Sequence, residues 1–171
     1  MMPTIQCFTT GGTIDKVYFD ALSEFEIGET ALHPILREAN VTVDFAVESL
    51  LRKDSLDITD ADRATIRAAV IGCAADRVLI THGTDTMAVT AAALAGIAGK
   101  TIVLTGAMQP ASLRSSDSIF NVGFAMAAVQ LLPHGVYVAM NGRVFDAGHV
   151  VKDRAANRFV DAAATICAGQ L

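Results

Sequence analysis

Residues 77–86, RVLITHGTDT, join a short apolar run to a loop that contains glycine and several threonines. Valine, leucine and isoleucine follow one another at 78–80, without the alternation of polar and apolar positions that a half-exposed strand shows. A continuous run of this kind is typical of a strand buried on both faces, as in a parallel sheet covered by helices. The segment therefore favours the α/β fold class.

Similar runs on either side of this segment predict the rest of the sheet. The predicted strands are residues 4–9, 43–50, 77–81, 101–105 and 136–140. Helical segments separate them, at 29–39 with an interruption at Pro34, after the capping box of Thr59 and Asp62, at 86–98 and at 117–132. We expect a three-layer, doubly wound, mostly parallel sheet of the Rossmann-like or flavodoxin-like type.

The size and composition of the chain suggest one acidic, apolar domain. Its 171 residues predict a single domain over 1–171, in which residues 155–171 have no clear period and are expected to form a docked arm or a partly disordered segment. The net charge of -5, without any basic run, argues against a nucleic-acid surface. Hydrophobic residues make up 52% of the chain, so we also expect a homo-oligomer, a dimer or tetramer, that buries apolar surface.

The sequence predicts a cytoplasmic protein without a membrane segment. Residues 118–142 lack charged side chains, but the Pro-His-Gly sequence at 133–135 divides them into pieces shorter than the roughly 20 residues that a membrane helix needs. The chain starts directly into a predicted strand without a charged leader. Cys7, Cys73 and Cys167 have no metal-ligand spacing and indicate free thiols in a reducing compartment.

Three of the predicted strands are followed by loops that combine glycine with hydroxyl groups. These loops are residues 9–13 (TTGGT), 81–86 (THGTDT) and 105–110 (TGAMQP). In an open parallel sheet, ligands bind outside the carboxyl ends of the strands, which is where all three loops should meet. One such loop alone is most often an ordinary glycine turn, whereas three at the same edge indicate a binding or catalytic site.

The motif content disfavours two common kinds of site. No GxxxxGK[ST] is present, and the paired glycines at 11–12 do not extend to GxGxxG, so a nucleotide site is disfavoured. GxSxG is also absent, which argues against a hydrolase with a nucleophile elbow. The hydroxyl groups available for chemistry at these loops are therefore those of threonine.

A threonine hydroxyl needs a base before it can act as a nucleophile. His82 adjoins Thr84, but neighbours in sequence usually point apart, so a structural role is the favoured interpretation of this histidine. A buried lysine is the stronger candidate, because desolvation leaves part of its amine unprotonated. Lys152 follows residues 141–151, which resemble a hairpin that could fold over the loops, although a lone lysine is more often a solvated surface group.

Together the motifs resemble those of the bacterial-type asparaginase/glutaminase family. The matching segments are TGGTI at 10–14, ITHGTDT at 80–86, GAMQP at 106–110 and MNGRVFD at 140–146, with Lys152 at the expected distance. The resemblance covers essentially the whole chain but only the amino-terminal catalytic domain of the family's usual two-domain subunit. It implies a short, single-domain L-asparaginase.

The resemblance also implies the reaction and its catalytic residues. Thr13 would attack the amide carbonyl, with Tyr18 as its hydrogen-bond partner. Thr84, Asp85 and Lys152 would form a second catalytic triad. The implied reaction is a two-step acyl transfer to water through a β-aspartyl ester, releasing ammonia and aspartate without a metal or cofactor.

The same resemblance implies the contacts to a small-molecule substrate. Asp85 would hold the α-ammonium group of L-asparagine, and Ser55 would hold its α-carboxylate. Ala107 would contact the amide nitrogen through its backbone. Backbone groups around Thr84 and the start of the following helix would stabilise negative charge. The implied substrate-binding residues are Gly12, Ser55, Gly83, Thr84, Asp85 and Ala107.

Two features depart from the family pattern. Leu56 stands where larger members often have a polar residue, which predicts weak glutaminase activity. In the two-domain family an acidic residue from a neighbouring subunit's carboxyl-terminal domain reaches the site, and this chain is expected to lack that domain. Asp20, Glu24 and Glu26 could take its place, although a solvated acidic loop is their more common role.

Two other functions stay open at this point. The first is a catalytically silent domain that binds an amino acid and acts as a sensor. The second is an amidase that acts on asparaginyl groups of a larger substrate or within an amidotransferase complex. A binder would need Asp85 and Ser55 but not two threonines with a lysine, so the sequence favours the enzyme.

Overall fold

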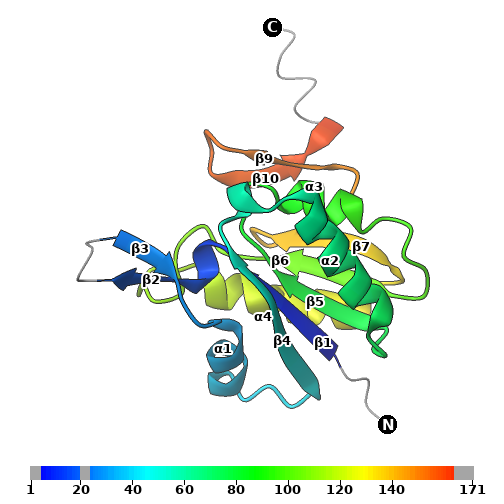
Figure 1. The fold of residues 1–171 in the computed structure, drawn as a ribbon, viewed down its shortest axis with the longest axis horizontal. Helices are drawn as coiled ribbons and strands as arrows, with labels where there is room; N and C mark the ends of the chain where they lie inside the picture. The colour runs from blue at the N-terminus through cyan, green and yellow to red at the C-terminus, as the bar shows by residue number, and fades with distance from the viewer. Residues whose placement is uncertain (1–4, 20–23, 164–171) are drawn as a thin grey trace, which may run out of the picture.

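A six-stranded sheet lies at the centre of the computed structural model, which describes residues 5–19 and 24–163 (Figure 1). In spatial order its strands are β4 (Phe45–Lys53), β1 (Ile5–Gly11), β5 (Arg77–Thr81), β6 (Thr101–Thr105), β7 (Gly135–Met140) and β8 (Arg143–Asp146). The first five run parallel, and β8 pairs antiparallel with β7. The predicted α/β class and mostly parallel sheet are confirmed.

Helices cover both faces of the sheet and form two hydrophobic cores. The helices are α1 (Leu32–Glu38), α2 (Asp60–Gly72), α3 (Met87–Ala93) and α4 (Ser118–Leu131). Neighbouring residues of β5 enter different cores, since Val78 and Ile80 pack with residues of α2 and α3, whereas Leu79 packs with residues of α1 and α4. Successive side chains of β5 thus point to opposite faces of the sheet, and both faces are covered by helices. Every residue of the run at 78–80 is therefore buried, which explains why all three are apolar.

The helices agree with the sequence prediction in place but differ in length. The capping box before α2 is confirmed, with Thr59 Oγ1 accepting from Asp62 N at 3.2 Å and Thr59 N donating to Asp62 Oδ2 at 2.8 Å. Pro34 does not interrupt α1, because it lies in the first turn, where proline is tolerated. The predicted helix over 86–98 was too long, since α3 ends at Ala93 and turns follow it.

Two antiparallel hairpins lie outside the central sheet. One pairs β2 (Lys16–Phe19) with β3 (Glu24–Ile27), and the other pairs β9 (Val150–Asp153) with β10 (Arg158–Asp161). Residues 158–161 of the expected docked arm form β10, whose Phe159 is buried in the core, while residues 164–171 lie outside the described residues. The hairpin predicted over 141–151 is only partly present, because β8 folds back on β7 and then leads into β9.

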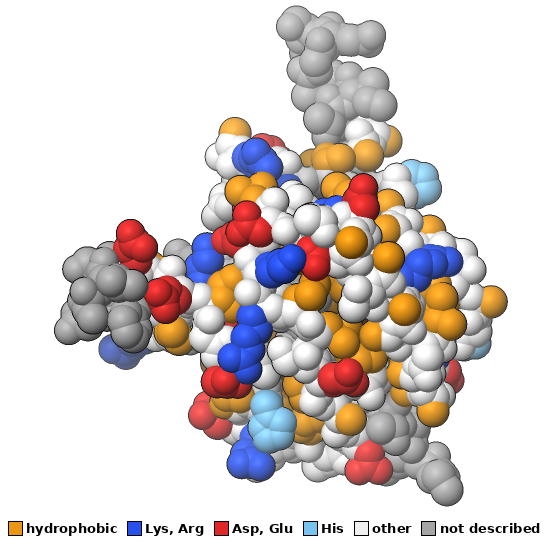
Figure 2. Space-filling model, viewed as in Figure 1, with side chains coloured by type: hydrophobic (Ala, Val, Ile, Leu, Met, Phe, Trp, Pro, Cys, Tyr) orange, Lys and Arg blue, Asp and Glu red, His pale blue; other side chains and the backbone are white. Residues whose placement is uncertain are grey.

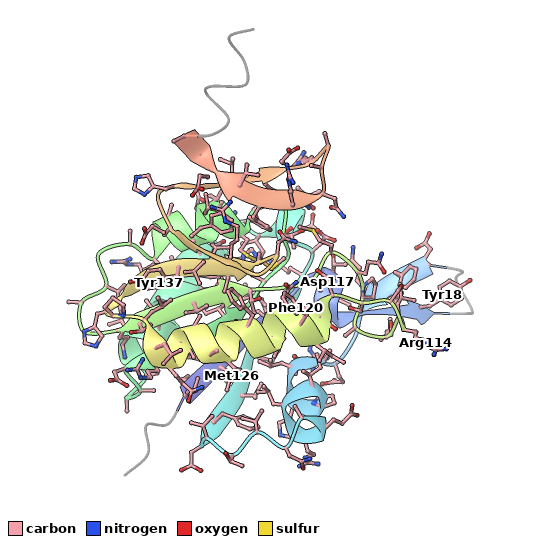
Figure 3. All side chains as sticks on the ribbon, turned by 180° about the vertical axis from the view of Figure 1, so that it is seen from behind. Tyr18, Arg114, Asp117, Phe120, Met126 and Tyr137 are labelled. Atoms are coloured by element: carbon pink, nitrogen blue, oxygen red, sulfur yellow. The ribbon has the colours of Figure 1, made fainter. Side chains whose placement is uncertain are left out.

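The outer surface carries charges of both signs. On the face that α2 and α3 cover, Figure 2 shows basic and acidic side chains interspersed. Seen from behind, α4 runs along the surface without another element over it (Figure 3). Within residues 5–19 and 24–163, no helix is both long and apolar enough to cross a bilayer.

Candidate active site

The loops that follow the central strands meet at the carboxyl edge of the sheet, and glycine makes this meeting possible. Gly12, with a φ of +86°, lies so close to Gly83 that an added Cβ would overlap the Gly83 backbone. A Cβ on Gly83 would lie 2.6 Å from Ser55 Cβ. A Cβ on Gly106 would overlap the carbonyl oxygen of His82. The three loops that the motifs predicted to meet are therefore in close contact, and the turn that contains Ser55 joins them.

Thr84, Asp85 and Lys152 form a hydrogen-bonded cluster at this edge. Lys152 Nζ donates to Thr84 Oγ1 at 2.8 Å and to Asp85 Oδ1 at 2.9 Å. The Lys152 side chain is 14% exposed and that of Asp85 31%, and Thr84 is buried. On the solvent side Arg154, which sequence reasoning missed, has its Nε 3.7 Å from Asp85 Oδ1. The structure thus joins a buried hydroxyl, an amine and a carboxylate across 68 residues of sequence.

The β9–β10 hairpin brings Lys152 to Thr84. Lys152 is paired in register with Phe159 of β10. The Phe159 side chain is buried in the core that α2 and α3 share, and its backbone N donates to Asn141 Oδ1 at 2.9 Å. Burial of this aromatic ring fixes the hairpin on the body of the protein, and the hairpin in turn fixes the lysine.

Ser55, which the family resemblance implies as a substrate-binding residue, lies beside Asp85. It is buried at the start of a short 3-10 turn, Ser55–Asp57, that follows β4. Asp85 N donates to Ser55 Oγ at 3.2 Å, and Thr86 Oγ1 donates to the Ser55 carbonyl at 2.7 Å. The next side chain, Leu56, is 65% exposed. Ser55 Oγ and the Asp85 carboxylate therefore border the same small region.

His82 has a structural role, which agrees with the favoured sequence interpretation. It is fully buried, with Nδ1 2.7 Å from Gly83 O and Nε2 2.8 Å from Thr90 Oγ1. Burial lowers the pKa of His82 to about 4, and nearby Arg63 lowers it further, whereas the hydrogen bond to Gly83 raises it. A carbonyl only accepts, so Nδ1 carries the proton and Nε2 accepts from Thr90. A neutral histidine with both nitrogens engaged is not available as a base for Thr84.

The loop that contains Ala107 is held by the start of α4. Asn121 Nδ2 donates to the Gly106 carbonyl at 3.0 Å. Asp117 accepts from Met108 N at 3.0 Å and lies at the amino-terminal end of α4, as Figure 3 shows. Ala107 itself is buried between these contacts. The backbone of this loop is therefore rigidly placed.

Thr13 has fewer polar contacts than Thr84. It lies half-buried in the 3-10 turn Thr13–Asp15, and its side chain makes no hydrogen bond to the described residues. The structure does not bring Tyr18 to it, because Tyr18 is 53% exposed and its ring packs edge-on against Phe25 at 5.5 Å. Figure 3 shows Tyr18 on the projecting β2–β3 hairpin, away from the central sheet.

The three acidic residues proposed as replacements for the neighbouring subunit's carboxylate also belong to this hairpin region. Glu24 and Glu26 are exposed on β3. Asp20 lies outside the described residues. Within the described residues, neither Glu24 nor Glu26 forms a hydrogen bond with Thr13.

Asp15 anchors the base of the hairpin, and sequence reasoning missed it. Its side chain is buried, and Oδ1 accepts from Ala31 N at 2.8 Å, while its carbonyl accepts from Gly28 N at 2.8 Å. Burial raises the pKa of Asp15 to about 6, although hydrogen bonds from Ala31 and Thr30 and the charge of Arg52 lower it. The only sequence signal was its position directly after the TGGTI motif.

An open groove of about 550 Å³ runs between the β2–β3 hairpin and the end of β4. Its lining is mostly charged and consists of Lys16, Phe25, Glu26, Ile27, Arg52, Lys53, Asp54 and Asp57. All three of its cations are paired, since Lys16 lies 2.7 Å from Asp54, Lys53 lies 2.8 Å from Asp62 and Arg52 lies 2.8 Å from Glu29. Among the residues placed in the structure, no group of three or more histidine, cysteine, aspartate or glutamate side chains is arranged to hold a metal ion.

Comparisons with known proteins show the family to which the chain belongs. Residues 4–171 match the model of the family "Asparaginase, N-terminal". The probable periplasmic L-asparaginase of Haemophilus influenzae is 31% identical over 162 residues, which cover 88% of this chain and 46% of that protein. A glutamyl-tRNA(Gln) amidotransferase component of Haloquadratum walsbyi is 29% identical over 153 residues, covering 85% of this chain and 34% of that protein.

The structural comparison gives the same result. The solved structure of the thermostable L-asparaginase from Thermococcus kodakarensis superimposes with a TM-score of 0.79 at 27% identity. The match covers 92% of this chain and 51% of that one. The chain thus spans about half the length of the asparaginases it matches. It belongs to the asparaginase family, within which it corresponds to the N-terminal domain.

Proposed function

We propose that the protein hydrolyses the side-chain amide of L-asparagine to L-aspartate and ammonia. The observation that supports this most directly is the cluster in which Lys152 Nζ lies 2.8 Å from Thr84 Oγ1 and 2.9 Å from Asp85 Oδ1. A domain that only bound an amino acid would need a carboxylate for the α-ammonium group, but not a lysine bonded to a buried hydroxyl. The cluster is the arrangement that activates a hydroxyl for acyl transfer.

In the proposed first step, Thr13 Oγ attacks the amide carbon. A β-aspartyl ester forms, the carbon–nitrogen bond breaks, and the hydroxyl proton leaves with the nitrogen as ammonia. In the second step water attacks the ester carbonyl and gives a proton, through the Thr84 hydroxyl, to the Lys152 amine, while Asp85 stabilises the positive charge. The bond between the carbonyl carbon and the Thr13 oxygen then breaks, the proton passes from Lys152 to the Thr13 oxygen, and L-aspartate is released.

The proposed substrate fits the polar groups at the carboxyl edge. The Asp85 carboxylate would accept from the α-ammonium group, and Ser55 Oγ would contact the α-carboxylate. Gly12 and Gly83 would let the substrate approach the backbone closely, and the Ala107 carbonyl would accept from the amide nitrogen. Leu56 offers no polar group to the longer side chain of glutamine. We therefore also propose weak glutaminase activity, and equal kcat/KM values for the two amides would contradict this.

The test of the proposal is ammonia release from L-asparagine by the wild type, Thr13→Ala and Thr84→Val. We expect activity in the wild type and its loss in both variants. Thr65→Ala, on the exposed side of α2, is a matched control that should keep full activity. A wild type that binds asparagine or aspartate but releases no ammonia would support the sensor function instead.

A second candidate function is an amidase that acts on asparaginyl groups of a larger substrate or within an amidotransferase complex. It is supported by the glutamyl-tRNA(Gln) amidotransferase sequences among the relatives. The open groove between the β2–β3 hairpin and the end of β4 would leave room for a larger group. The two functions are separated by comparing kcat/KM for free L-asparagine and for an asparagine within a peptide, with the higher value identifying the substrate class.

We also propose that the protein assembles as a cytoplasmic homo-oligomer. Helix α4 has no charged residue, and Ile119, Phe120 and Leu131 are 65%, 62% and 82% exposed on it. Burying them against a copy would remove apolar surface from water. Light scattering of the wild type and of Phe120→Glu tests the assembly.

The cytoplasmic location is proposed because Cys7 and Cys73 are free thiols. Cys167 lies outside the described residues. Cell fractionation tests the location.

A further inference from the structure

Asp85 lies between two cations that differ in their environment. Lys152 approaches Oδ1 at 2.9 Å from the interior with a side chain that is 14% exposed. Arg154 approaches the same oxygen with its Nε at 3.7 Å and has a side chain that is 70% exposed. Within the described residues, Arg154 makes no other ion pair or hydrogen bond. One carboxylate oxygen thus contacts a buried amine and an exposed guanidinium group.

We propose that Arg154 is a specificity-determining residue that binds the α-carboxylate of a free amino acid, together with Ser55. The inference rests on the proposed function and narrows its substrate class to free, zwitterionic L-asparagine. An amino-acid zwitterion carries both charges on one carbon, so it can insert between Asp85 and Arg154. The substrate ammonium then pairs with Asp85, and the substrate carboxylate pairs with the released guanidinium.

The surrounding contacts allow this exchange without loss of the site. Lys152 holds Asp85 from the buried side, so Arg154 can leave Asp85 while the carboxylate keeps its position. Ser55 Oγ accepts from Asp85 N at 3.2 Å, which places the serine next to the carboxylate that Arg154 faces. A carboxylate bound at Ser55 would therefore lie within reach of the long arginine side chain.

The turn that carries Arg154 is itself ordered. Asp153 Oδ1 accepts from the backbone N of Ala155 and of Ala156, both at 3.1 Å. Phe159, on the other strand of the hairpin, is buried in the core. The backbone position of Arg154 is thus fixed, and only its side chain has to move.

An arginine that merely pairs with Asp85 would behave in the opposite way. It would compete with every substrate ammonium, so its removal would strengthen the binding of any amine. Such an exposed ion pair also contributes little to stability. The sign of the change in KM therefore separates the two roles.

The experiment compares L-asparagine with L-asparagine α-amide, which keeps the ammonium and the side-chain amide but lacks the carboxylate. Chromatography distinguishes the product of side-chain hydrolysis, L-aspartic acid α-amide, from L-asparagine formed by loss of the other amide. We expect Arg154→Gln to raise the KM for L-asparagine about 10-fold, the effect of one charge-assisted hydrogen bond, with little change in kcat. The KM for the α-amide should stay the same or fall.

Two further variants define the origin of the change. Arg154→Lys should recover part of the affinity for L-asparagine, because it restores the positive charge. Arg158→Gln, an exposed arginine of the same hairpin, should leave both KM values unchanged. An equal rise in KM for both substrates, or no rise for either, would overturn the role of Arg154.

A binding measurement separates this inference from the proposed function. Titration calorimetry gives the Kd of L-aspartate and of its α-amide for the wild type and Arg154→Gln. We expect only the Kd of L-aspartate to increase in the variant. If the wild type releases no ammonia but shows this pattern, the hydrolase proposal fails and the arginine assignment stands. An unchanged Kd of L-aspartate, or no binding to the wild type, refutes the arginine assignment.

Discussion

The regions around Thr84 and Thr13 contain the two hydroxyls that we propose to be catalytic, but they are built in different ways. Thr84 is buried at the carboxyl edge of the sheet, and its hydroxyl is bonded to Lys152. Thr13 is half-buried at the base of a two-stranded hairpin that projects from the sheet, and Tyr18 is 53% exposed on that hairpin. The fold assembles the first region by itself. In the second region, Thr13 lies in a turn at the sheet edge, but Tyr18, the partner that the family resemblance implies, is not in contact with it.

The difference shows how each region is stabilised. Side chains at the ends of parallel strands inherit their position from the sheet and from glycines that let the loops touch. On the β2–β3 hairpin Tyr18 and Phe25 are 53% and 46% exposed, so mainly local pairing holds that hairpin, whereas the β9–β10 hairpin that carries Lys152 is docked through the buried Phe159. Substitutions in the first region should therefore affect activity and stability together, and those of exposed side chains on the β2–β3 hairpin should affect activity alone.

The largest effect is expected for Lys152→Met, which removes the amine that contacts Thr84. We expect kcat to fall about 1,000-fold, the usual contribution of a general base. Steady-state ammonia release measures the loss, and circular dichroism checks that the variant is folded. A folded variant with more than a tenth of wild-type kcat would show that the Thr84 region is not catalytic.

Gly83→Ala should come next, since its Cβ would lie 2.6 Å from Ser55 Cβ. We expect a loss of about 2 kcal/mol in the free energy of unfolding, typical of overpacking, together with a lower kcat/KM. Gly72→Ala is the matched control, because it lies at the end of α2 with nothing within 4 Å of the added Cβ. Denaturant titration should show the control at or slightly above wild-type stability.

Tyr18→Phe tests the second region alone. We expect kcat to fall about 10-fold, because the hydroxyl would bond to Thr13 only when substrate draws the hairpin inward. The melting temperature should not change, since the hydroxyl is exposed in the structure. An unchanged kcat would remove Tyr18 from the site, and a fall in melting temperature would show that the hairpin is more tightly packed than described.

Asp15→Asn should have the smallest effect on activity and a clear effect on the pH dependence of stability. Burial raises the pKa of Asp15 to about 6, so between about pH 4 and 6 the folded state holds a proton that the unfolded state has lost. The free energy of unfolding of the wild type should therefore decrease as the pH rises through this range, by about 2 kcal/mol from this group. Urea titrations at pH 4.5 and 7 should show that the variant lacks this decrease, and parallel behaviour of the two proteins would contradict it.

The sequence predicted the sheet well because each central strand is buried on both faces. Three adjacent aliphatic residues in a strand, such as those at 78–80, point alternately to the two faces of the sheet. All three are buried only if a hydrophobic core lies on each face. The carboxyl-edge loops followed from the strands, since parallel strands end at one edge. The pairing of Thr84 with Lys152 was inferred from the family resemblance, because no local pattern relates residues that are 68 positions apart.

The parts that were missed depend on long-range packing. β10 is four residues long and has charged residues at both ends, so only the burial of Phe159 in the core identifies it as part of a docked hairpin. Asp15 stands next to Lys16 in the sequence and resembles an exposed charged pair, yet its carboxyl is buried against Ala31 N. Arg154 lies in a turn, where an arginine gives no sequence signal of the carboxylate that it faces.

Delivery of Lys152 by the β9–β10 hairpin affects how the protein would lose activity on heating. The hairpin forms a sheet of its own, separate from the six-stranded sheet, and small units of this kind open at a lower free energy than the whole molecule. Each opening withdraws the amine from Thr84 while the central sheet stays intact. Inactivation should then begin several degrees below the melting of the secondary structure and be reversible on cooling. Activity would thus report local opening of one hairpin, and spectroscopy would report global unfolding.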